Sequence, residues 1–453
     1  MRGPRTSRRG AALLIAITSI AILTAVAVDL AYNTRVSLQM AANARDELRA
    51  TYLAKSGVAL SRLVLSFQQR LDQATGTTSP GTTSPGTTNT AATKPAAANT
   101  AATQLAQGMS SMRIALRLWE LVPVDSTMAA LFLGGSGTGG EGGAGARPAA
   151  LASGGDGRGA APSAGEAARR AFGDVEGSFQ ATIEDEERKV NVRQFTGFNY
   201  QQFAQAMRLA QLVRDPRWDF LFDEDDANGF RVGRKELFGA IKDWQDEDET
   251  GDVFTGDPLK PFENGFGDEN ALYDRLTDRY KAKNAPFDSL DELFMVGGVT
   301  DAFMAAFGDK LTVYPDTSAT INVNTTDPQQ LMVNALVMSD PQGVLQPALM
   351  DPAFLGKLQA ALALLRPLPF LSITPQQFAS ALAALGLKIH PVFLQASTGG
   401  QRNPFGDRST TFHIRATGNA GEVRKTLDAI VTFDRRAEGL AQDQGRLLHW
   451  REE

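Results

Sequence analysis

The sequence has no cysteine and very little histidine. Without cysteine in its 453 residues, disulfides, thiolate zinc sites and cysteine nucleophiles are excluded. The three histidines, His390, His413 and His449, are far apart and lack the spacing of metal ligands. Phosphate-binding loops, HExxH motifs and nucleophile elbows are also missing from the sequence. We therefore expect that the protein is not an enzyme.

Basic charge is also scarce for a chain of this length. There are 45 Lys and Arg residues against 51 Asp and Glu residues, which gives a formal net charge of -6. A general nucleic-acid binder needs a basic face to contact phosphates, so we expect no nucleic-acid partner. The length exceeds that of one compact core, and it predicts two or three structural units.

What the sequence does have is a long apolar run near its start. Four arginines, at positions 2, 5, 8 and 9, precede residues 11–28, which carry no charge. As a helix this run would span about 27 Å, close to the thickness of the hydrocarbon core of a bilayer. The positive-inside rule places the arginines in the cytoplasm and the rest of the chain outside. A plain signal anchor is one interpretation of this pattern.

The apolar run continues into a second helical pattern without a break. Residues 29–67 contain no proline and a single glycine, Gly57. Apolar residues recur there at spacings near three, four and seven, at Val36, Met40, Leu48, Leu53, Leu60 and Val64. This periodicity predicts a stem helix with an apolar face to bury.

Basic residues, a glycine and an apolar helix that leads into an amphipathic stem resemble a type IV prepilin leader. The resemblance implies that prepilin peptidase cuts between Gly10 and Ala11 on the cytoplasmic side and methylates Ala11. Most pilins have a glutamate at the fifth mature position, where this chain has Ile15. That absence is typical of the minor pseudopilin K of type II secretion systems and implies a place at the tip.

The middle of the chain changes composition several times. Residues 75–104 are rich in Thr, Pro, Gly and Ala and are expected to be disordered, and residues 134–165 are rich in glycine and are expected to be flexible. Neither segment is expected to have a function of its own. Two β-hairpins are predicted, one around "EDEER" at 184–188 and one around "GNAGE" at 418–422. The roughly two hundred residues between them have mainly helical patterns.

These patterns predict an α+β fold of the type IV pilin kind. A transmembrane and stem helix would pack on a small antiparallel sheet, and a large α-helical domain would interrupt that sheet in sequence. The expected layout is a leader at 1–10, the transmembrane and stem helix at 11–72, low-complexity insertions with a short ordered segment at 73–168, the sheet at 169–195 and 405–436, the inserted helical domain with an acidic site at 196–404, and a tail without an evident partner at 437–453.

Acidic residues are concentrated in two segments of the predicted helical domain. The first, at 243–252, has six acids in ten residues, and the second, at 263–270, adds acidic and amide side chains. So many carboxylates repel one another unless they are solvated or share a cation, and Ca²⁺ accepts six to eight oxygen ligands in irregular geometry. A solvated acidic loop is the alternative. An earlier segment, "DEDDANGF" at 223–230, lacks the closing glutamate of an EF-hand and is expected to be a solvated turn, with Asp225 and Asp226 as weak candidates.

The resemblance to pseudopilin K extends through this region. The motifs "DWQDEDE", "GDENALY", "NAPFDSLDELFMVGGVT" and "TINVNTTDPQQL" follow one another in the order typical of that family. The resemblance implies calcium as a cofactor, and the loop between the two acidic segments is longer here than is usual. Matching the motifs gives the implied ligands Asp243, Asp246, Asp248, Glu249, Glu269 and Asn270, with Asp252 and Asp268 as further candidates.

The motifs "DELFMVGGVT" and "INVNTTDPQQL" also resemble helix-hairpin-helix DNA receptors. Such a hairpin presents backbone amides to phosphates and needs Lys or Arg nearby. Here acids flank the turn, at Asp288, Asp291, Glu292 and Asp301. We therefore predict a structural helix–turn–helix pair without DNA binding.

Together the motifs predict a minor pseudopilin at the tip of the type II secretion pseudopilus, which initiates assembly and supports export of folded proteins. Its expected partners are the I-type and J-type minor pseudopilins, the major pseudopilin and prepilin peptidase, with the secretin or cargo as further contacts. Its expected location is the inner membrane, as a single-pass protein with most of the chain in the periplasm. The alternatives are a membrane-anchored, calcium-dependent periplasmic binding protein such as a DNA-uptake receptor, and a minor pilin of a type IV pilus.

Overall fold

The computed structural model describes most of the chain in twelve stretches. These are residues 8–76, 113–114, 117–121, 123–129, 177–226, 229–276, 278–317, 319–340, 346–367, 371–394, 403–433 and 445–453. The side chains of residues 8–12, 71–76, 113, 114, 118 and 121 lie outside this description. Most of the predicted leader and of the low-complexity insertions is therefore outside the described residues, and Gly10 and Ala11 are described only as helical backbone.

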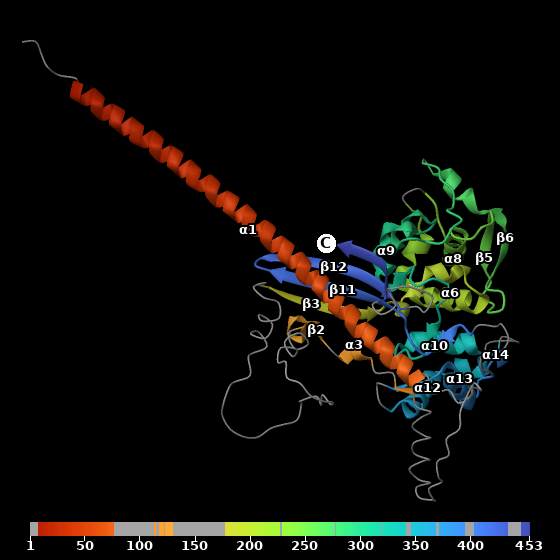
Figure 1. The fold of residues 1–453 in the computed structure, drawn as a ribbon. Helices are drawn as coiled ribbons and strands as arrows, with labels where there is room; N and C mark the ends of the chain where they lie inside the picture. Colours follow the sequence, from red (N-terminus) through yellow and green to blue (C-terminus); the bar gives the residue numbers. More distant parts are fainter. Residues whose placement is uncertain are drawn as a thin grey trace, which may run out of the picture.

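The first element is one uninterrupted helix, α1 (Arg8–Gly76), of 69 residues. Its first half stands clear of the rest of the molecule, and its second half lies across a sheet (Figure 1). The exposed half contains a window of mean hydropathy 2.4 that is entirely unburied, so it is long and apolar enough to cross a membrane by length and composition. A signal sequence passes the same test.

The sheet under α1 has five antiparallel strands in the order β13-β12-β11-β3-β2. The predicted hairpin around "GNAGE" is confirmed, because β11 and β12 pair over their full length. The strands are β2 (Val124–Asp125), β3 (Ser178–Asp185), β11 (Thr411–Ala420), β12 (Val423–Thr432) and β13 (Arg446–Glu452).

Alternation along the strands turns one face of the sheet toward the stem helix. Ala54, Val58 and Leu65 of α1 form a buried cluster with inward residues such as Ile414 and Ala429. At the crossing the helix comes so close that a Cβ on Gly418 would lie 2.0 Å from the carbonyl oxygen of Ala50. Glycine is required there because the two backbones are nearly in contact.

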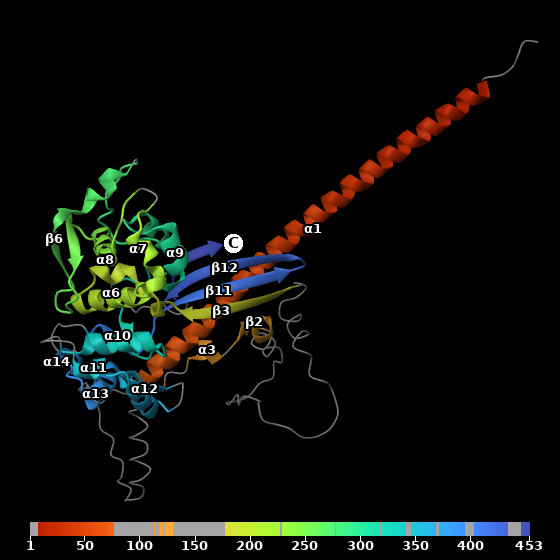
Figure 2. The same ribbon diagram turned by 180° about the vertical axis from the view of Figure 1, so that it is seen from behind.

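A large domain, the head, is inserted between β3 and β11, and it lies beside the sheet at the end far from the apolar half of α1 (Figures 1 and 2). Buried aromatic and aliphatic residues such as Phe195, Phe303 and Phe378 belong to one continuous core. Its α-helices are α6 (Asn199–Val213), α7 (Phe220–Asp223), α8 (Arg234–Asp243), α9 (Asp301–Phe307), α10 (Pro328–Met338), α11 (Pro347–Met350), α12 (Phe354–Leu365), α13 (Pro375–Ala384) and α14 (Pro391–Leu394).

Short strands and 3₁₀ turns complete the head, which is not purely helical. The strands pair as β4 with β7, β5 with β6, β10 with β8, and β9 with β1 from the segment before β3. Their bounds are β1 (Arg113–Ile114), β4 (Val190–Asn191), β5 (Thr250–Phe254), β6 (Phe262–Asp268), β7 (Leu311–Thr312), β8 (Ile321–Asn322), β9 (Leu371–Ser372) and β10 (Phe405–Gly406). The short helix α3 (Leu118–Leu121) follows β1.

Two local predictions from the sequence are wrong. The segment "EDEER" does not close a hairpin, because the side chain of Asp185 accepts from the Glu187 amide and starts a 3₁₀ turn, η1 (Glu186–Arg188). The chain then enters the head, where β4 pairs in parallel with β7. The end of the chain is not a loose tail either, because β13 pairs with β12 and forms an edge of the sheet.

The expected fold class is confirmed. The structure combines a long N-terminal apolar helix, a small antiparallel sheet and a mainly helical domain that interrupts the sheet in sequence.

Candidate metal centre

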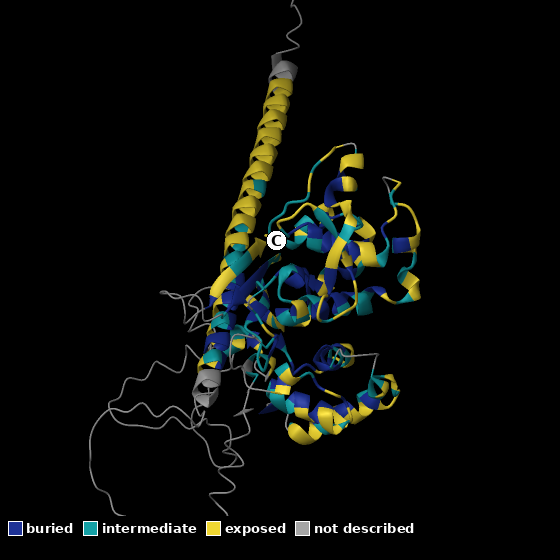
Figure 3. Cartoon of the chain, turned by 90° about the vertical axis from the view of Figure 1, so that its right-hand side faces the viewer, coloured by how far each residue is buried: buried dark blue, intermediate teal, exposed yellow. Residues whose placement is uncertain are grey.

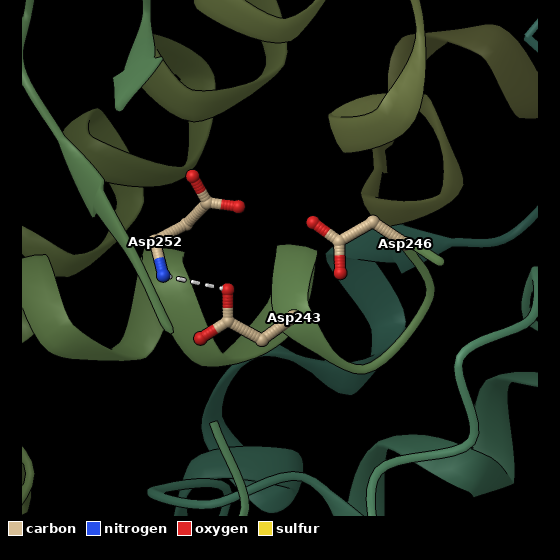
Figure 4. Close-up of side chains that lie close together, drawn as sticks. All are labelled: Asp243, Asp246 and Asp252. Atoms are coloured by element: carbon tan, nitrogen blue, oxygen red, sulfur yellow. Dashed lines mark hydrogen bonds between the residues drawn. The ribbon is translucent and has the colours of Figure 1, made fainter. Parts of the chain in front are cut away.

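Three aspartates meet at the junction of α8 and the β5–β6 hairpin. Asp243 is the last residue of α8, Asp246 follows in the next turn, and Asp252 lies in β5. One carboxylate oxygen from each residue lies within 4.8 Å of the other two. Figure 4 shows the three side chains converging on one space. Oxygens so spaced can share one Ca²⁺ ion, whose ligands lie at about 2.3–2.6 Å.

Backbone and side-chain contacts hold this cluster, which we call the aspartate cluster, in place. The amide of Asp252 donates to Oδ1 of Asp243 at 2.9 Å. The ammonium of Lys242 lies 2.6 Å from Oδ2 of Asp246 and also contacts the carboxylate of Asp252. The aspartate cluster therefore carries three carboxylates and one ammonium in a largely buried setting.

Burial and mutual repulsion disfavour the charged carboxylates. Burial, together with the charges of Asp252 and Asp246, raises the pKa of Asp243 to about 8. Burial also raises the pKa of Asp246 to about 6, although its hydrogen bond to Lys242 acts in the opposite direction. Burial alone would lower the pKa of Lys242, but its hydrogen bonds to the two aspartates raise it. A cation between the carboxylates would relieve this repulsion.

Next to the aspartate cluster is a second buried carboxylate. Glu269, in the 3₁₀ turn η4 (Glu269–Ala271), is 6% exposed, and burial raises the pKa of its carboxyl, although the nearby side chain of Asn284 acts in the opposite direction. Neither carboxylate oxygen has a hydrogen-bond partner among the described residues, and the same holds for Oδ1 of Asp246 and Oδ1 of Asn284. Buried polar atoms are normally hydrogen-bonded. Such a set of unpartnered hard oxygens fits the coordination of Ca²⁺.

The structure separates the six predicted ligands into three groups. Asp243 and Asp246 come together, and Asp252, a further candidate, joins them. Asp248 and Glu249 are exposed, and Oδ1 of Asp248 accepts from the Thr250 amide at 2.8 Å.

Glu269 and Asn270 form the third group, buried in η4. Oδ1 of Asn270 accepts from the Ala282 amide at 3.0 Å, and Asp268 caps the same turn. The full ligand set remains a prediction.

Sequence reasoning missed two residues of this region, Lys242 and Asn284. Lys242 directly precedes the acidic segment in the sequence. This position was the signal from which a contact between the lysine and the acids could have been predicted. Asn284 opens the "NAPF" motif, and its positive φ of 49° places it in the left-handed region that asparagine tolerates. The side-chain amide of Asn284 donates to the backbone carbonyl of Asp248 at 3.1 Å. This contact places the unpartnered side-chain oxygen of Asn284 in the same region.

The turn that resembles a DNA-binding hairpin is used within the fold. It joins the 3₁₀ helix η6 (Leu290–Met295) to α9. The Gly297 amide donates to the hydroxyl of Tyr273 at 3.3 Å, and the Val299 amide donates to the carbonyl of Val296 at 3.0 Å. The nearby Lys283 is paired with Asp288 and Glu292. Two amides of the turn and this lysine are thus already engaged by protein groups.

Comparison with known proteins finds similarity to a curated sequence. Over 109 residues the chain is 28% identical to "Type II secretion system protein K" of Aeromonas hydrophila. This chain resembles that protein. The match covers 24% of this chain and spans about a third, 30%, of the relative's length. No protein-family model matches the chain.

A solved structure also overlaps with the fold. It is the crystal structure of the GspK-GspI-GspJ complex from the type 2 secretion system of enterotoxigenic Escherichia coli. The overlap covers 61% of this chain and 80% of the other, with 14% identity and a TM-score of 0.34. At that TM-score the likeness is too distant to carry a structural argument. The resemblance to protein K that the motifs indicate is supported by the curated sequence.

Proposed function

We propose that this protein is a K-type minor pseudopilin at the tip of the type II secretion pseudopilus. There it would initiate assembly with the I-type and J-type minor pseudopilins and the major pseudopilin, and so support export of folded proteins across the outer membrane. Its work would be done by packing and not by catalysis. The motif order and the similarity to protein K support this proposal.

The observation that carries it is an apolar stripe left uncovered on α1. Leu48, Tyr52, Leu63 and Phe67 are 62%, 68%, 41% and 50% exposed, on the side of the helix away from the sheet. At about 100° per residue these four positions share one side of α1. The first half of α1, from which the stem continues, is exposed along its length (Figure 3). Apolar stem helices of sister pseudopilins would cover the stripe.

The head favours a place at the tip. It is inserted between β3 and β11 and widens the molecule at the end far from the apolar half of α1 (Figure 1). A subunit of that width would leave no room for another subunit above it. Ile15, in place of a glutamate, agrees with a subunit that enters first, since it offers no carboxylate to a neighbour's amino terminus.

The membrane placement follows from the first half of α1. The apolar half would remain in the inner membrane as a single span, with the arginines in the cytoplasm and the sheet and head in the periplasm. Prepilin peptidase would remove residues 1–10 and methylate Ala11. The mass of the mature amino terminus tests this directly: methylated Ala11 supports it, and an intact Met1 overturns it.

Calcium would stabilise the head in this function. Asp243, Asp246 and Asp252 would hold the ion, with Glu269 and the oxygen of Asn284 as neighbouring oxygen donors. The ion would join the end of α8 to the β5–β6 hairpin and neutralise carboxylates that otherwise repel one another.

The decisive experiment is co-purification of the full chain, in detergent, with I-type and J-type pseudopilins. We expect the triple variant Leu48→Ser, Tyr52→Ser, Leu63→Ser to lose the complex because it removes the apolar stripe. The control variant is Met350→Ser, which changes a residue 69% exposed on the head, and it should bind as the wild type does. A complex unaffected by the triple variant, or normal secretion by cells that lack the protein, would overturn the proposal.

Two alternative functions have distinct outcomes. A DNA-uptake receptor would shift DNA in a gel at physiological salt, and a minor pilin would co-purify with type IV pilus subunits instead. The engaged amides of residues 297 and 299 argue against the first.

A further inference from the structure

We infer that Lys242 is a built-in counter-ion that occupies the cation position of the aspartate cluster and must leave when calcium binds. This inference rests on the proposed calcium site. It concerns the residue that sets how tightly the site binds, and the motif match does not include that residue.

The ammonium of Lys242 lies where a bound calcium ion would lie. The ammonium nitrogen of Lys242 lies 2.6 Å from Oδ2 of Asp246 and contacts the carboxylate of Asp252. A calcium ion would lie at about 2.3–2.6 Å from the same oxygens. The three carboxylate oxygens are within 4.8 Å of one another, which is the spacing for one shared cation. An ammonium and a calcium ion therefore compete for the same lone pairs.

The aspartate cluster keeps a net negative charge that is largely shielded from solvent. Three carboxylates and one ammonium leave the cluster with a formal charge of -2. The side chains of Lys242 and Asp252 are 14% and 5% exposed, so little solvent screens this charge. Lys242 partly neutralises the acids when no metal is bound, and a divalent ion would do so more completely.

The lysine also has a route out. It lies in the last turn of α8, and its flexible four-carbon stem can swing without a change in the backbone. The ring of Phe262 lies next to it, with the ammonium 5.9 Å from the ring centroid, and offers an apolar surface for the stem. Displacement costs the two ion pairs, so Lys242 lowers the calcium affinity while it stabilises the metal-free head.

Calcium titration of the full chain in detergent tests the energetic part. We expect Lys242→Met, which keeps the length of the stem, to bind calcium about tenfold more tightly or better, because a like charge beside the ion is removed. The matched variant Lys242→Arg keeps the charge and should bind no more tightly than the wild type. In EGTA, Lys242→Met should unfold at a lower temperature than the wild type.

Amine acetylation of the wild-type chain, read by mass spectrometry, tests the displacement without a mutation. Lys242 should react slowly in EGTA and at least several-fold faster with calcium. Lys260, whose side chain is 67% exposed, should react at the same rate in both and serves as the control.

The outcomes separate this inference from the site. If the wild type binds no calcium, the metal centre itself fails, and the inference fails with it. If the wild type binds calcium but the Lys242→Met affinity and the acetylation rate do not change, the site stands and the role of Lys242 is overturned.

Discussion

Buried and half-buried acids at the base of the head differ from those at the metal centre. At the base, Asp185 accepts from the Ser409 hydroxyl at 2.6 Å, and Oε1 of Glu187 accepts from the amide and hydroxyl of Thr410 and the amide of Thr411. At the metal centre, neither oxygen of Glu269 accepts a well-formed hydrogen bond from the described residues, although the side chain of Asn284 lies close to this carboxylate.

The difference separates a structural role from a binding role. Hydrogen bonds from protein groups offset part of the cost of burying a carboxylate, and an acid held in this way joins two segments of the fold. A buried acid without donors is compensated only when something else binds to it. The base of the head should therefore be stable without metal, and the region around Glu269 should depend on it.

The largest effect is expected where α1 crosses the sheet, a region whose stability should not depend on metal. Gly418→Val should destabilise the protein by about 3 kcal/mol or more, with or without calcium, because any Cβ there meets the Ala50 carbonyl at 2.0 Å. Thermal unfolding and proteolysis of α1 measure this. The control is Gly356→Ala, where a Cβ meets nothing within 4 Å, and it should be neutral or slightly stabilising. Equal stability of the two variants would contradict the close approach of stem and sheet.

The next effect concerns the metal centre directly. Calcium at about 100 times its dissociation constant should stabilise the wild-type protein by about 2.7 kcal/mol, and Glu269→Gln should lose much of that gain. The measurement is the shift in unfolding temperature between EGTA and calcium. Glu187→Gln is the control, since that acid already has donors, and it should keep the whole calcium shift. A full calcium shift in Glu269→Gln would show that this carboxylate is no ligand.

A third prediction uses the pH dependence of the base of the head. Burial, together with the charge of Asp185, raises the pKa of Glu187 to about 8. An acid with a raised pKa in the folded state binds its proton more tightly there than in the unfolded chain, so its contribution to stability is complete below about pH 4.5 and is lost as the pH rises toward 8. Glu187→Gln should flatten this decline.

Urea unfolding from pH 5 to pH 8 measures the decline, with Glu184→Gln as the control because Glu184 is exposed in β3, just before the turn that holds Glu187. If Glu187→Gln loses stability with rising pH as steeply as the wild type does, Glu187 is not the group responsible for the decline.

Sequence patterns predicted those parts that follow from local periodicity. The apolar run and its continuation gave α1, and the "GNAGE" turn gave the β11–β12 hairpin. The pairing of β4 with β7 could not be predicted, because about 120 residues separate the partners and two-residue strands leave no periodic signal. The β13 strand was missed for a different reason, since its partner is chosen by the open edge of β12 and not by its own composition.

The metal centre was predicted in part. Acid density located the segment, and the structure brings Asp243 and Asp246 together as expected. Spacing alone could not show that Asp252 returns to them through a β-hairpin, nor that Asp248 and Glu249 face solvent. Lys242 was not predicted as part of the site, because a lysine next to acids in sequence normally forms an ion pair at the surface. Only the fold shows that its side chain is largely buried.

The smallest expected effect comes from an exposed ion pair. Lys55 of α1 lies 3.0 Å from Glu452 of β13, and the two side chains are 42% and 47% exposed. Solvent screens such a pair, so Lys55→Ala should cost about 0.5 kcal/mol or less, and 1 M salt should remove the difference from the wild type. Two results would contradict this: a loss of several kcal/mol of unfolding free energy in the variant, or free exchange of the amide hydrogens of β13 in the variant. Either result would mean that the ion pair, and not the hydrogen bonds to β12, holds the end of the chain. The pairing of β12 with β13 runs from Leu427 to Thr432 with one register shift, between Ile430 and Val431, and it leads us to expect slow exchange in both proteins.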